Sequence, residues 1–169
     1  MVLPKRKSPR LKGYNYSQNG AYFVTICTYE RKCVLSRIVA EYSRNVGEGL
    51  RALPQNIMMP IGNEIEKSIQ FINKNYTSVH VDKYVIMPNH IHLIVVLNDS
   101  GGYGNPPLQN IIGQLKSYTT DKFGNVLWQR SYHDHIIRGE EDYKKIWDYI
   151  DTNVTRWKED CFYNKETEQ

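Results

Sequence analysis

The chain has 169 residues, of which 40% are hydrophobic and 24% charged, and its net charge is +4 at pH 7. These values are those of an ordinary globular protein, long enough for one domain with a core of its own. No apolar run is long enough to span a bilayer, and no apolar segment follows the basic start as in a secretory signal, so we expect no membrane partner.

The start of the chain is basic and lacks acidic residues. Residues 1–20 predict an N-terminal arm, whose cations are Lys5, Arg6, Lys7, Arg10 and Lys12. Such an arm suits a phosphate backbone, but it is equally consistent with a solvated leader. After the arm, the β-branched and aromatic residues from Ala21 to Thr28 predict the first strand.

The segment that follows has no clear pattern before a helix begins. Within residues 29–59, a short hairpin is predicted at Val34-Leu35 and Ile38-Val39, and loops are favoured by Gly47, Gly49 and Pro54. Isoleucines at helical spacing then predict a helix over residues 61–76, with Pro60 in its first turn.

Two strands and a helix are predicted next. Residues 79–87 and 90–97 read as strands joined by a tight turn, and therefore as an antiparallel pair. Residues 99–106 form a glycine-rich connector without a phosphate-binding glycine motif. Apolar spacing from Leu108 to Thr119 indicates a second helix.

The last elements complete a recognisable order. Residues 126–137 predict a strand, and residues 140 to about 157 predict a helix with acidic residues in its first turn. The order of elements matches an α+β fold, a ferredoxin-like antiparallel sheet with helices packed on it and an additional C-terminal helix. We expect a single domain over residues 21–160 and a tail over 161–169. The cysteines (Cys27, Cys33 and Cys161) lack metal-site spacing, which favours reduced thiols and a cytoplasmic protein.

The most informative motif is His90-Ile91-His92. Side chains alternate between the faces of a strand, so the two imidazoles point to the same side of the sheet. Two neutral imidazole nitrogens on one face are a good start on a divalent-metal site. The alternative is a polar strand end in which both rings are simply hydrogen-bonded, and the spacing alone leaves both open.

The last helix carries a second pair of interest. Tyr149 lies beside the apolar stripe of this helix, and Asn153 is one turn further on. A phenol and an amide therefore project from the same side of the helix, next to the stripe. Both could also be ordinary surface residues. Tyr118 is a rival, but its partner one turn on is Lys122, a cation that cannot bind a metal. Spacing therefore favours Tyr149 modestly.

Together these stretches resemble the HUH single-tyrosine transposases, and most of all the IS200-like, REP-associated branch. The resemblance rests on Met87-Pro88-Asn89-His90-Ile91-His92, and it is supported by residues 20–28, 113–117 and 128–138, followed by 149–153. It implies metal ligation by His90, His92 and Asn153, with Tyr149 as nucleophile. The branch often has Asn-Pro where this chain has Asn153-Val154, so the helix is expected to end differently.

The resemblance also implies the activity. A metal-dependent endonuclease and strand transferase would cut single-stranded DNA beside a hairpin, through a 5′-phosphotyrosine link, with Mg²⁺ or Mn²⁺ as cofactor. Tyrosine needs such help because its pKa near 10 leaves it protonated at neutral pH. Monomer and homodimer both stay open. Further DNA contacts are expected from the arm cations and from Lys116, Arg130 and Arg138.

Other interpretations remain. His133 and His135 also share a strand face, but the acidic residue between them breaks the motif, so polar contacts are favoured over a second metal site. The chain could be a domesticated, non-catalytic protein that binds hairpin DNA. All four residues that the resemblance implies for the site are present, however, which speaks against a loss of activity. A zinc hydrolase built on the histidine pair would need a carboxylate ligand, and no suitably spaced one is evident.

Overall fold

The computed structural model describes residues 11, 13–43, 51–99 and 104–163. Within these residues the chain forms a four-stranded antiparallel sheet, a separate two-stranded hairpin and three α-helices. The strands are β1 (Gly20–Cys27), β2 (Ser36–Ser43), β3 (Arg51–Met58), β4 (Val79–Ile86), β5 (His90–Leu97) and β6 (His133–Ile136). The α-helices are α1 (Pro60–Asn75), α2 (Leu108–Phe123) and α3 (Glu140–Thr152), with short 3-10 helices η1 (Tyr29–Arg31) and η2 (Trp157–Glu159).

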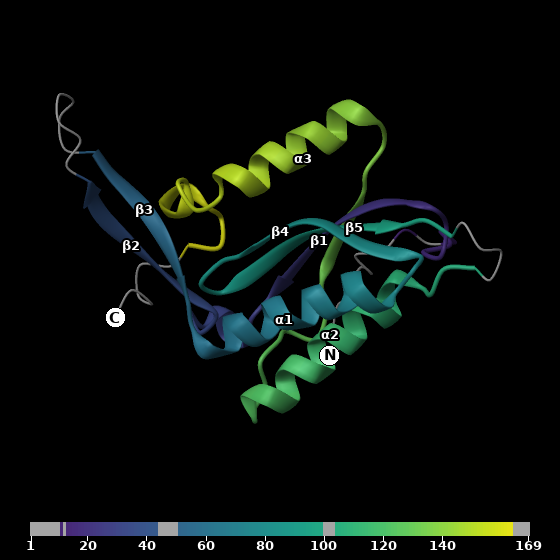
Figure 1. Ribbon diagram of the computed structural model, residues 1–169, viewed down its shortest axis with the longest axis horizontal. Helices are drawn as coiled ribbons and strands as arrows, with labels where there is room; N and C mark the ends of the chain where they lie inside the picture. The colour runs from purple at the N-terminus through teal and green to yellow at the C-terminus, as the bar shows by residue number, and fades with distance from the viewer. Residues whose placement is uncertain (1–10, 12, 44–50, 100–103, 164–169) are drawn as a thin grey trace, which may run out of the picture.

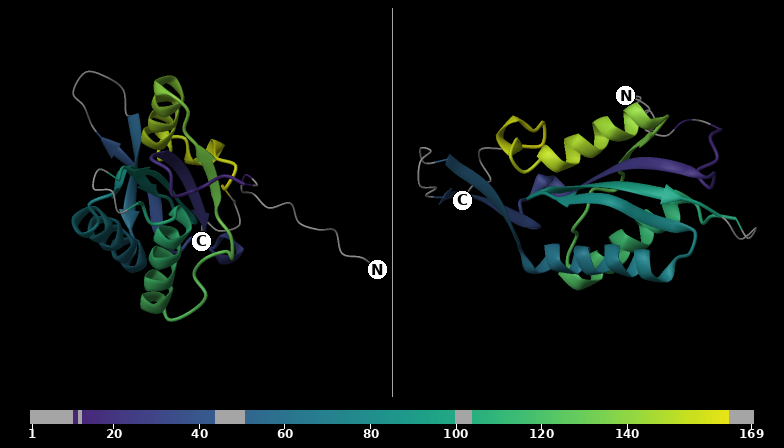
Figure 2. Two further views of the ribbon diagram at one scale, coloured as in Figure 1. Left: turned by 90° about the vertical axis from the view of Figure 1, so that its right-hand side faces the viewer. Right: turned by 45° about the horizontal axis from the view of Figure 1, so that its top comes forward.

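The sheet has the order β4-β5-β1-β6, which confirms the ferredoxin-like arrangement. Helices α1 and α2 lie against one face of this sheet, and α3 crosses the other face, as Figures 1 and 2 show. β5 is therefore a central strand between β4 and β1, with helices on both sides. The predicted strand over residues 90–97 is confirmed at both ends.

The core lies between the sheet and the pair α1 and α2. From β5 it takes one set of alternating side chains, which are Ile91, Leu93, Val95 and Leu97. The isoleucines of α1 and the apolar residues of α2 complete it. Because side chains alternate, His90, His92 and Ile94 point to the opposite face, toward α3. The register of β5 thus decides that the imidazoles face the third helix.

The predicted short hairpin of Val34-Leu35 with Ile38-Val39 is wrong, because Ile38 and Val39 lie in β2 and pair with β3 instead. The strands of the hairpin β2–β3 pair over eight positions each, from Ser36 with Met58 to Ser43 with Arg51, and the hairpin projects beyond the end of the main sheet (Figure 1). The predicted loop at Pro54 is wrong, because Pro54 lies within β3 opposite Ala40. An isolated two-stranded ribbon has a free edge, where a residue without an N–H is tolerated. Gly47 and Gly49 lie outside the described residues.

The base of this hairpin is fixed to the turn before the histidines. Ser36 Oγ and Asn56 Nδ2 both donate hydrogen bonds to the carbonyl of Ile86, at 3.1 and 2.7 Å. The first turn of α1 packs so closely here that a Cβ on Gly62 would lie 2.2 Å from the Leu35 carbonyl oxygen. Only glycine fits this approach, so hairpin, helix and turn form one packed corner.

Two predicted boundaries are wrong. The strand over residues 126–137 is shorter, since only His133–Ile136 is a strand and Trp128 makes an isolated bridge with Thr28. The last helix ends at Thr152 and not near Trp157, with Asn153 as its C-cap. Cys27 and Cys161 are free thiols, in agreement with the sequence. Among the described helices, none has the length and apolar character needed to cross a membrane.

Candidate active site

The Nε2 atom of His90 faces the space between the sheet and the C-terminal segment. The His90 side chain is fully buried, and Nδ1 lies 2.9 Å from Asn89 Oδ1. Asn89 Nδ2 donates to the Phe162 carbonyl at 2.8 Å, which leaves Oδ1 as the group facing the ring. The proton of a neutral ring therefore sits on Nδ1, and Nε2 carries the lone pair. Among the described residues, Nε2 has no hydrogen-bond partner.

His92 lies beside it and connects the sheet to α3. The ring centroids of the two histidines are 4.5 Å apart, and His92 is 1% exposed. Nδ1 is 2.8 Å from Oγ1 of Thr25, its cross-strand neighbour on β1. Nε2 is 3.2 Å from the hydroxyl of Tyr149. The phenol that helical spacing singled out is thus brought to the imidazole pair within one chain.

Asn153 also reaches the site. It is 2% exposed, and Nδ2 donates to Asp160 Oδ2 at 3.1 Å. Its Oδ1 is buried and lacks a hydrogen-bond partner among the described residues. Tyr149, one turn earlier, remains 40% exposed while its hydroxyl points at His92. The helix therefore offers a half-accessible phenol and a buried amide oxygen on the same side.

Asp160 is a site residue that the sequence did not reveal. Its Oδ2 is 3.5 Å from the Tyr149 hydroxyl and 3.9 Å from His90 Nε2. His90, His92 and Asp160 each offer one ligand atom within 4.8 Å of the others, and they are the only such group of histidine, cysteine and acidic residues in the described part of the chain. Asp160 follows η2, where the chain turns back over the sheet. Nothing in its local sequence signals that return.

The segment after α3 covers the imidazoles. The Phe162 ring lies 4.5 Å from the His90 ring, and the Trp157 ring lies 6.0 Å from it, measured between centroids. Arg31 stacks over Phe162 at 5.1 Å and donates from Nη1 to the Cys161 carbonyl at 3.3 Å. Arg31 has a left-handed backbone, with φ of 55°, which is uncommon outside glycine and is often found at functional sites.

Burial controls the protonation of the site. It lowers the pKa of His92 to about 3 and, with help from His92 and Arg31, holds the pKa of His90 well below its usual value. Burial, and then the negative charge of Asp160, raises the pKa of Tyr149 to about 12. At neutral pH the site therefore holds two neutral imidazoles and a protonated phenol.

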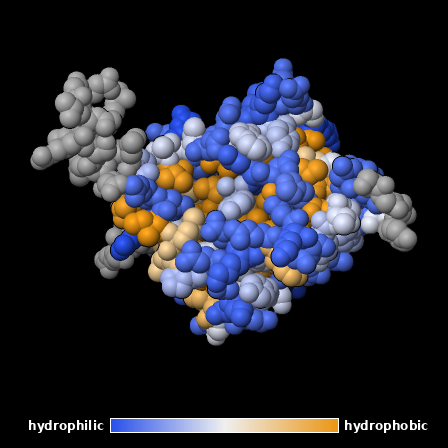
Figure 3. All heavy atoms as spheres, viewed as in Figure 1, coloured by the Kyte–Doolittle hydropathy of each residue, from blue (hydrophilic) through white to orange (hydrophobic). Residues whose placement is uncertain are grey.

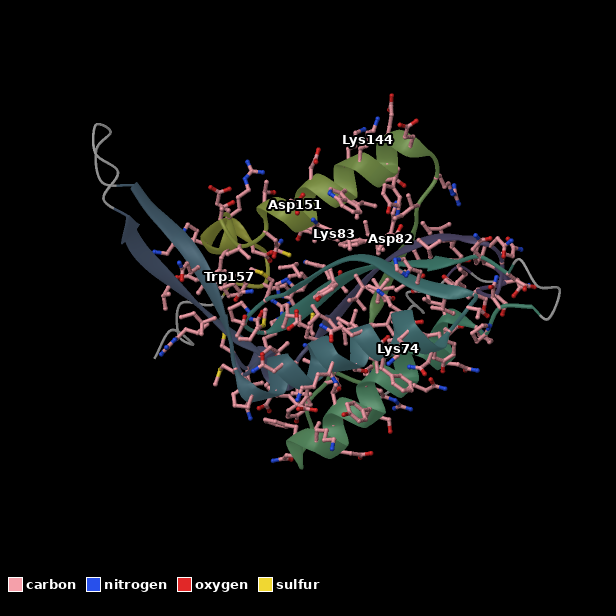
Figure 4. All side chains as sticks on the ribbon, in the orientation of Figure 1. Lys74, Asp82, Lys83, Lys144, Asp151 and Trp157 are labelled. Carbon is pink, nitrogen blue, oxygen red and sulfur yellow. The ribbon has the colours of Figure 1, made fainter. Side chains whose placement is uncertain are left out.

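Polar contacts attach α3 to the edge strand β4. A β-bulge between Val81 and Lys83 puts Asp82 and Lys83 on the same face, toward α3 (Figure 4). The Tyr143 hydroxyl donates to Asp82 Oδ2 at 2.6 Å. Lys83 forms an ion pair with Asp151, and its Nζ lies 4.5 Å from the centre of the Trp147 ring. In Figure 3 hydrophobic residues show between hydrophilic ones in the band between α3 and α1, where β4 lies.

The remaining predicted residues lie elsewhere. Tyr118 is on α2, across the sheet from the imidazoles, and its hydroxyl donates to Glu64, so it is no rival to Tyr149. His135 contacts Asp142 at 2.8 Å, a polar contact of the kind favoured above. Lys116 donates to the carbonyls of residues 129 and 130. Arg130 and Arg138 are exposed, and the arm cations lie outside the described residues, so their DNA contacts stay predictions.

Comparison with solved structures identifies the fold. The chain matches a REP-associated tyrosine transposase, solved bound to a REP hairpin, with a TM-score of 0.59 and 17% identity, over 93% of this chain and 74% of that one. The chain therefore shares its fold with a tyrosine transposase. A Deinococcus radiodurans R1 protein, provisionally described as a transposase, matches with a TM-score of 0.44 and 16% identity, over 85% of this chain and 97% of that one, which is too low to add to the argument.

Sequence comparison defines the family. The chain is 31% identical to an uncharacterised protein of Haemophilus influenzae over 180 aligned positions, covering 94% of this chain and 93% of the relative. The chain belongs to the same family as that protein. No family model matches it.

Proposed function

We propose that this protein cleaves and rejoins single-stranded DNA through a 5′-phosphotyrosine intermediate, with Tyr149 as the nucleophile. The observation that carries the proposal is the 3.2 Å separation between the Tyr149 hydroxyl and His92 Nε2, which puts a phenol against a buried imidazole pair. The fold shared with a tyrosine transposase supports the same activity. Because all these residues belong to one chain, a single copy suffices to assemble the site.

The residues fit a divalent cation. His90 Nε2 and Asn153 Oδ1 are buried acceptors that lack a hydrogen-bond partner among the described residues, and a cation would satisfy both. We assign His90, His92 and Asn153 as ligands of Mg²⁺ or Mn²⁺. When bound, the ion would polarise a phosphoryl oxygen and stabilise the charge on the departing 3′ oxygen.

Tyr149 supplies the attacking oxygen. This oxygen forms a bond to phosphorus as the bond between phosphorus and the 3′ oxygen breaks; the phenol loses one proton and the 3′ oxygen gains one. The product is itself a phosphodiester, so a second 3′-hydroxyl can reverse the step and reseal a strand. The raised pKa of Tyr149, about 12, keeps the phenol protonated and unreactive toward other electrophiles until a substrate is positioned.

The DNA partner is inferred from the fold and the exposed cations. The transposase with this fold was solved with a REP hairpin, and we propose a hairpin with a single-stranded flank as substrate here. Phe162 and Trp157 cover the His90 side, whereas Tyr149 is 40% exposed, so the strand is expected to approach from the side of α3. Arg130, Arg138 and the basic arm would contact the phosphate backbone.

A covalent-adduct assay tests the proposal. The protein is incubated with hairpin oligonucleotides bearing single-stranded flanks, taken from DNA around the coding region, with Mg²⁺ or Mn²⁺, and the products are separated in denaturant. Wild type should form a denaturant-stable protein–DNA adduct and Tyr149→Phe should form none, because only the hydroxyl is removed. Tyr118→Phe is the matched control, since Tyr118 is a similarly exposed phenol on the other side of the sheet.

Three results would contradict the proposal. Failure of wild type to form an adduct on every hairpin, with binding unchanged in the presence of chelator, would favour the non-catalytic hairpin-binding alternative. Equal adduct formation by Tyr149→Phe would place the nucleophile elsewhere. Cleavage without any adduct, by a protein that retains stoichiometric zinc, would instead favour the hydrolase.

A further inference from the structure

We propose that Asp160 is a direct carboxylate ligand of the metal, so that the segment after α3 completes the metal site. This inference rests on the metal-dependent function proposed above and adds a ligand to the set of two histidines and an asparagine. It assigns a chemical role to a residue that lies after the last helix and outside the HUH motif.

Asp160 lies beside two buried acceptors, His90 Nε2 and Asn153 Oδ1, that lack a hydrogen-bond partner among the described residues. Asp160 Oδ2 faces His90 Nε2 at 3.9 Å, and the hydrogen-bonding of Asn89 leaves that nitrogen as a lone pair without a proton. A neutral imidazole nitrogen and a carboxylate oxygen cannot hydrogen-bond to each other without a proton between them. A divalent cation between them would bind the nitrogen and the oxygen at once.

The burial of the carboxylate supports the same conclusion. The Asp160 side chain is 2% exposed, and among the described residues it forms no ion pair with a lysine or arginine. A buried carboxylate requires pairing with a positive charge or a metal. Two neutral imidazoles and one carboxylate give the group a charge of −1, which a divalent cation converts to +1, a favourable sign for a DNA phosphate.

The carboxylate also accounts for the choice of metal. Imidazole and amide ligands alone suit zinc at least as well as Mg²⁺ or Mn²⁺, whereas carboxylate oxygen is the ligand that the two harder ions prefer. Asp160 therefore reconciles the histidine pair with a magnesium- or manganese-dependent reaction.

Asp160 has a local structural role that must be separated from ligation. Its Oδ1 accepts from the backbone N–H of Phe162 at 2.7 Å, and its Oδ2 accepts from Asn153 Nδ2. Asp160→Asn keeps an acceptor for Phe162 and removes only the charge, so it separates the two roles. Glu159→Gln is the matched control, because Glu159 is the preceding residue in the same segment and its side chain is 74% exposed.

The test measures metal binding without reference to activity. Mn²⁺ is titrated into the chelator-treated full chain, and free Mn²⁺ is followed by its electron paramagnetic resonance signal. Wild type should bind one ion per chain, Asp160→Asn should bind it about tenfold more weakly or worse, and Glu159→Gln should match wild type. Thermal melts in chelator should agree for all three proteins, which shows that the loss comes from the ligand and not from folding.

The outcomes separate the two proposals. If wild type binds no Mn²⁺, the metal-dependent function and the ligand both fail. If Asp160→Asn binds Mn²⁺ as tightly as wild type, only the ligand assignment is overturned; faster adduct formation by that variant would then show that Asp160 holds a cover over the site. If Asp160→Asn melts earlier in chelator, Asp160→Glu decides: it keeps the charge, so ligation requires that it retain more Mn²⁺ affinity than Asp160→Asn, and equal loss in both overturns the assignment.

Discussion

The two halves of the site are built in different ways. The imidazoles come from β5, a central strand in which every residue except Val96 is buried. The phenol comes from α3, in which Ile150 is the only buried residue, and which contacts β4 through the polar side chains of Asp82 and Lys83. The strand half is thus part of the core, whereas the helix half is attached to the surface of the sheet.

This difference has a functional meaning. Ligands on a packed strand keep their geometry whether or not a metal is bound. This favours metal binding, because the side chains lose little conformational entropy when the metal binds. A helix held by partly exposed polar contacts can shift at small cost, because such contacts contribute little free energy each. Under the proposed function, a nucleophile that aligns with different DNA ends during cleavage and rejoining would benefit from the second kind of attachment.

The largest difference in stability between the two halves of the site should appear when the pH is lowered. The pKa of both buried histidines is lower in the folded protein than the unfolded value of 6.5, so the unfolded chain binds more protons. The stability is fully present above pH 6.5 and is lost as pH falls toward the folded pKa values. Between pH 7 and pH 5 each histidine should remove about 2 kcal/mol from the free energy of unfolding.

Urea unfolding in chelator at a series of pH values measures this loss. Substituting both histidines by glutamine should flatten the pH profile, whereas His133→Gln should leave its slope as in wild type, because His133 is exposed. A double variant whose profile runs parallel to wild type would show that the imidazoles are not held neutral by the strand.

Truncation of core side chains should have the next largest effect. Leu93→Ala on β5 removes a fully buried side chain and should cost about 3 kcal/mol in the free energy of unfolding. Ile146→Ala on α3, which removes a half-buried side chain, should cost about 1 kcal/mol or less. Denaturant unfolding of the two variants checks the contrast, and similar losses would mean that α3 belongs to the core.

The sequence was most informative where the structure depends on local pattern. The continuous apolar run predicts the strand β5, and the alternation of side chains along it predicts that both imidazoles lie on the same face of the sheet. The placement of Tyr149 followed from helical spacing only with the family resemblance, because half-exposed residues leave no hydrophobic signature. The end of α3 was placed too late because Val154 and Trp157 continue the apolar spacing, although the chain turns after Thr152 to pack Trp157 near His90.

Asp160 could not be found in this way. It lies eleven positions after Tyr149, beyond the helix, and its relation to His90 exists only because the chain folds back over the sheet. The two histidines that it faces lie on β5, far away in the sequence, and no spacing rule connects them with Asp160. Likewise, the long hairpin around Pro54 is stabilised by pairing along its whole length, which outweighs the local preference of a proline for loops.

Breaking the contact between β4 and α3 should have the smallest effect on stability, and that effect should be confined to α3. Lys83→Ala removes the ion pair with Asp151 and the contact with the Trp147 ring, and should cost less than about 1 kcal/mol because Asp151 is half exposed.

The lost free energy should weaken only the attachment of α3 to the sheet. Amide hydrogen exchange in α3 should therefore rise up to about fivefold, while the β5 amides keep their protection. Lys144→Ala is the matched control, since Lys144 is an exposed lysine of α3 whose ion pair, with Glu140, lies within that helix. Because Tyr149 depends on that attachment and the imidazoles do not, adduct formation should fall while Mn²⁺ affinity stays within about twofold of wild type. Faster exchange in β5, or an equal loss of metal affinity, would show instead that the helix and the strand open as one unit.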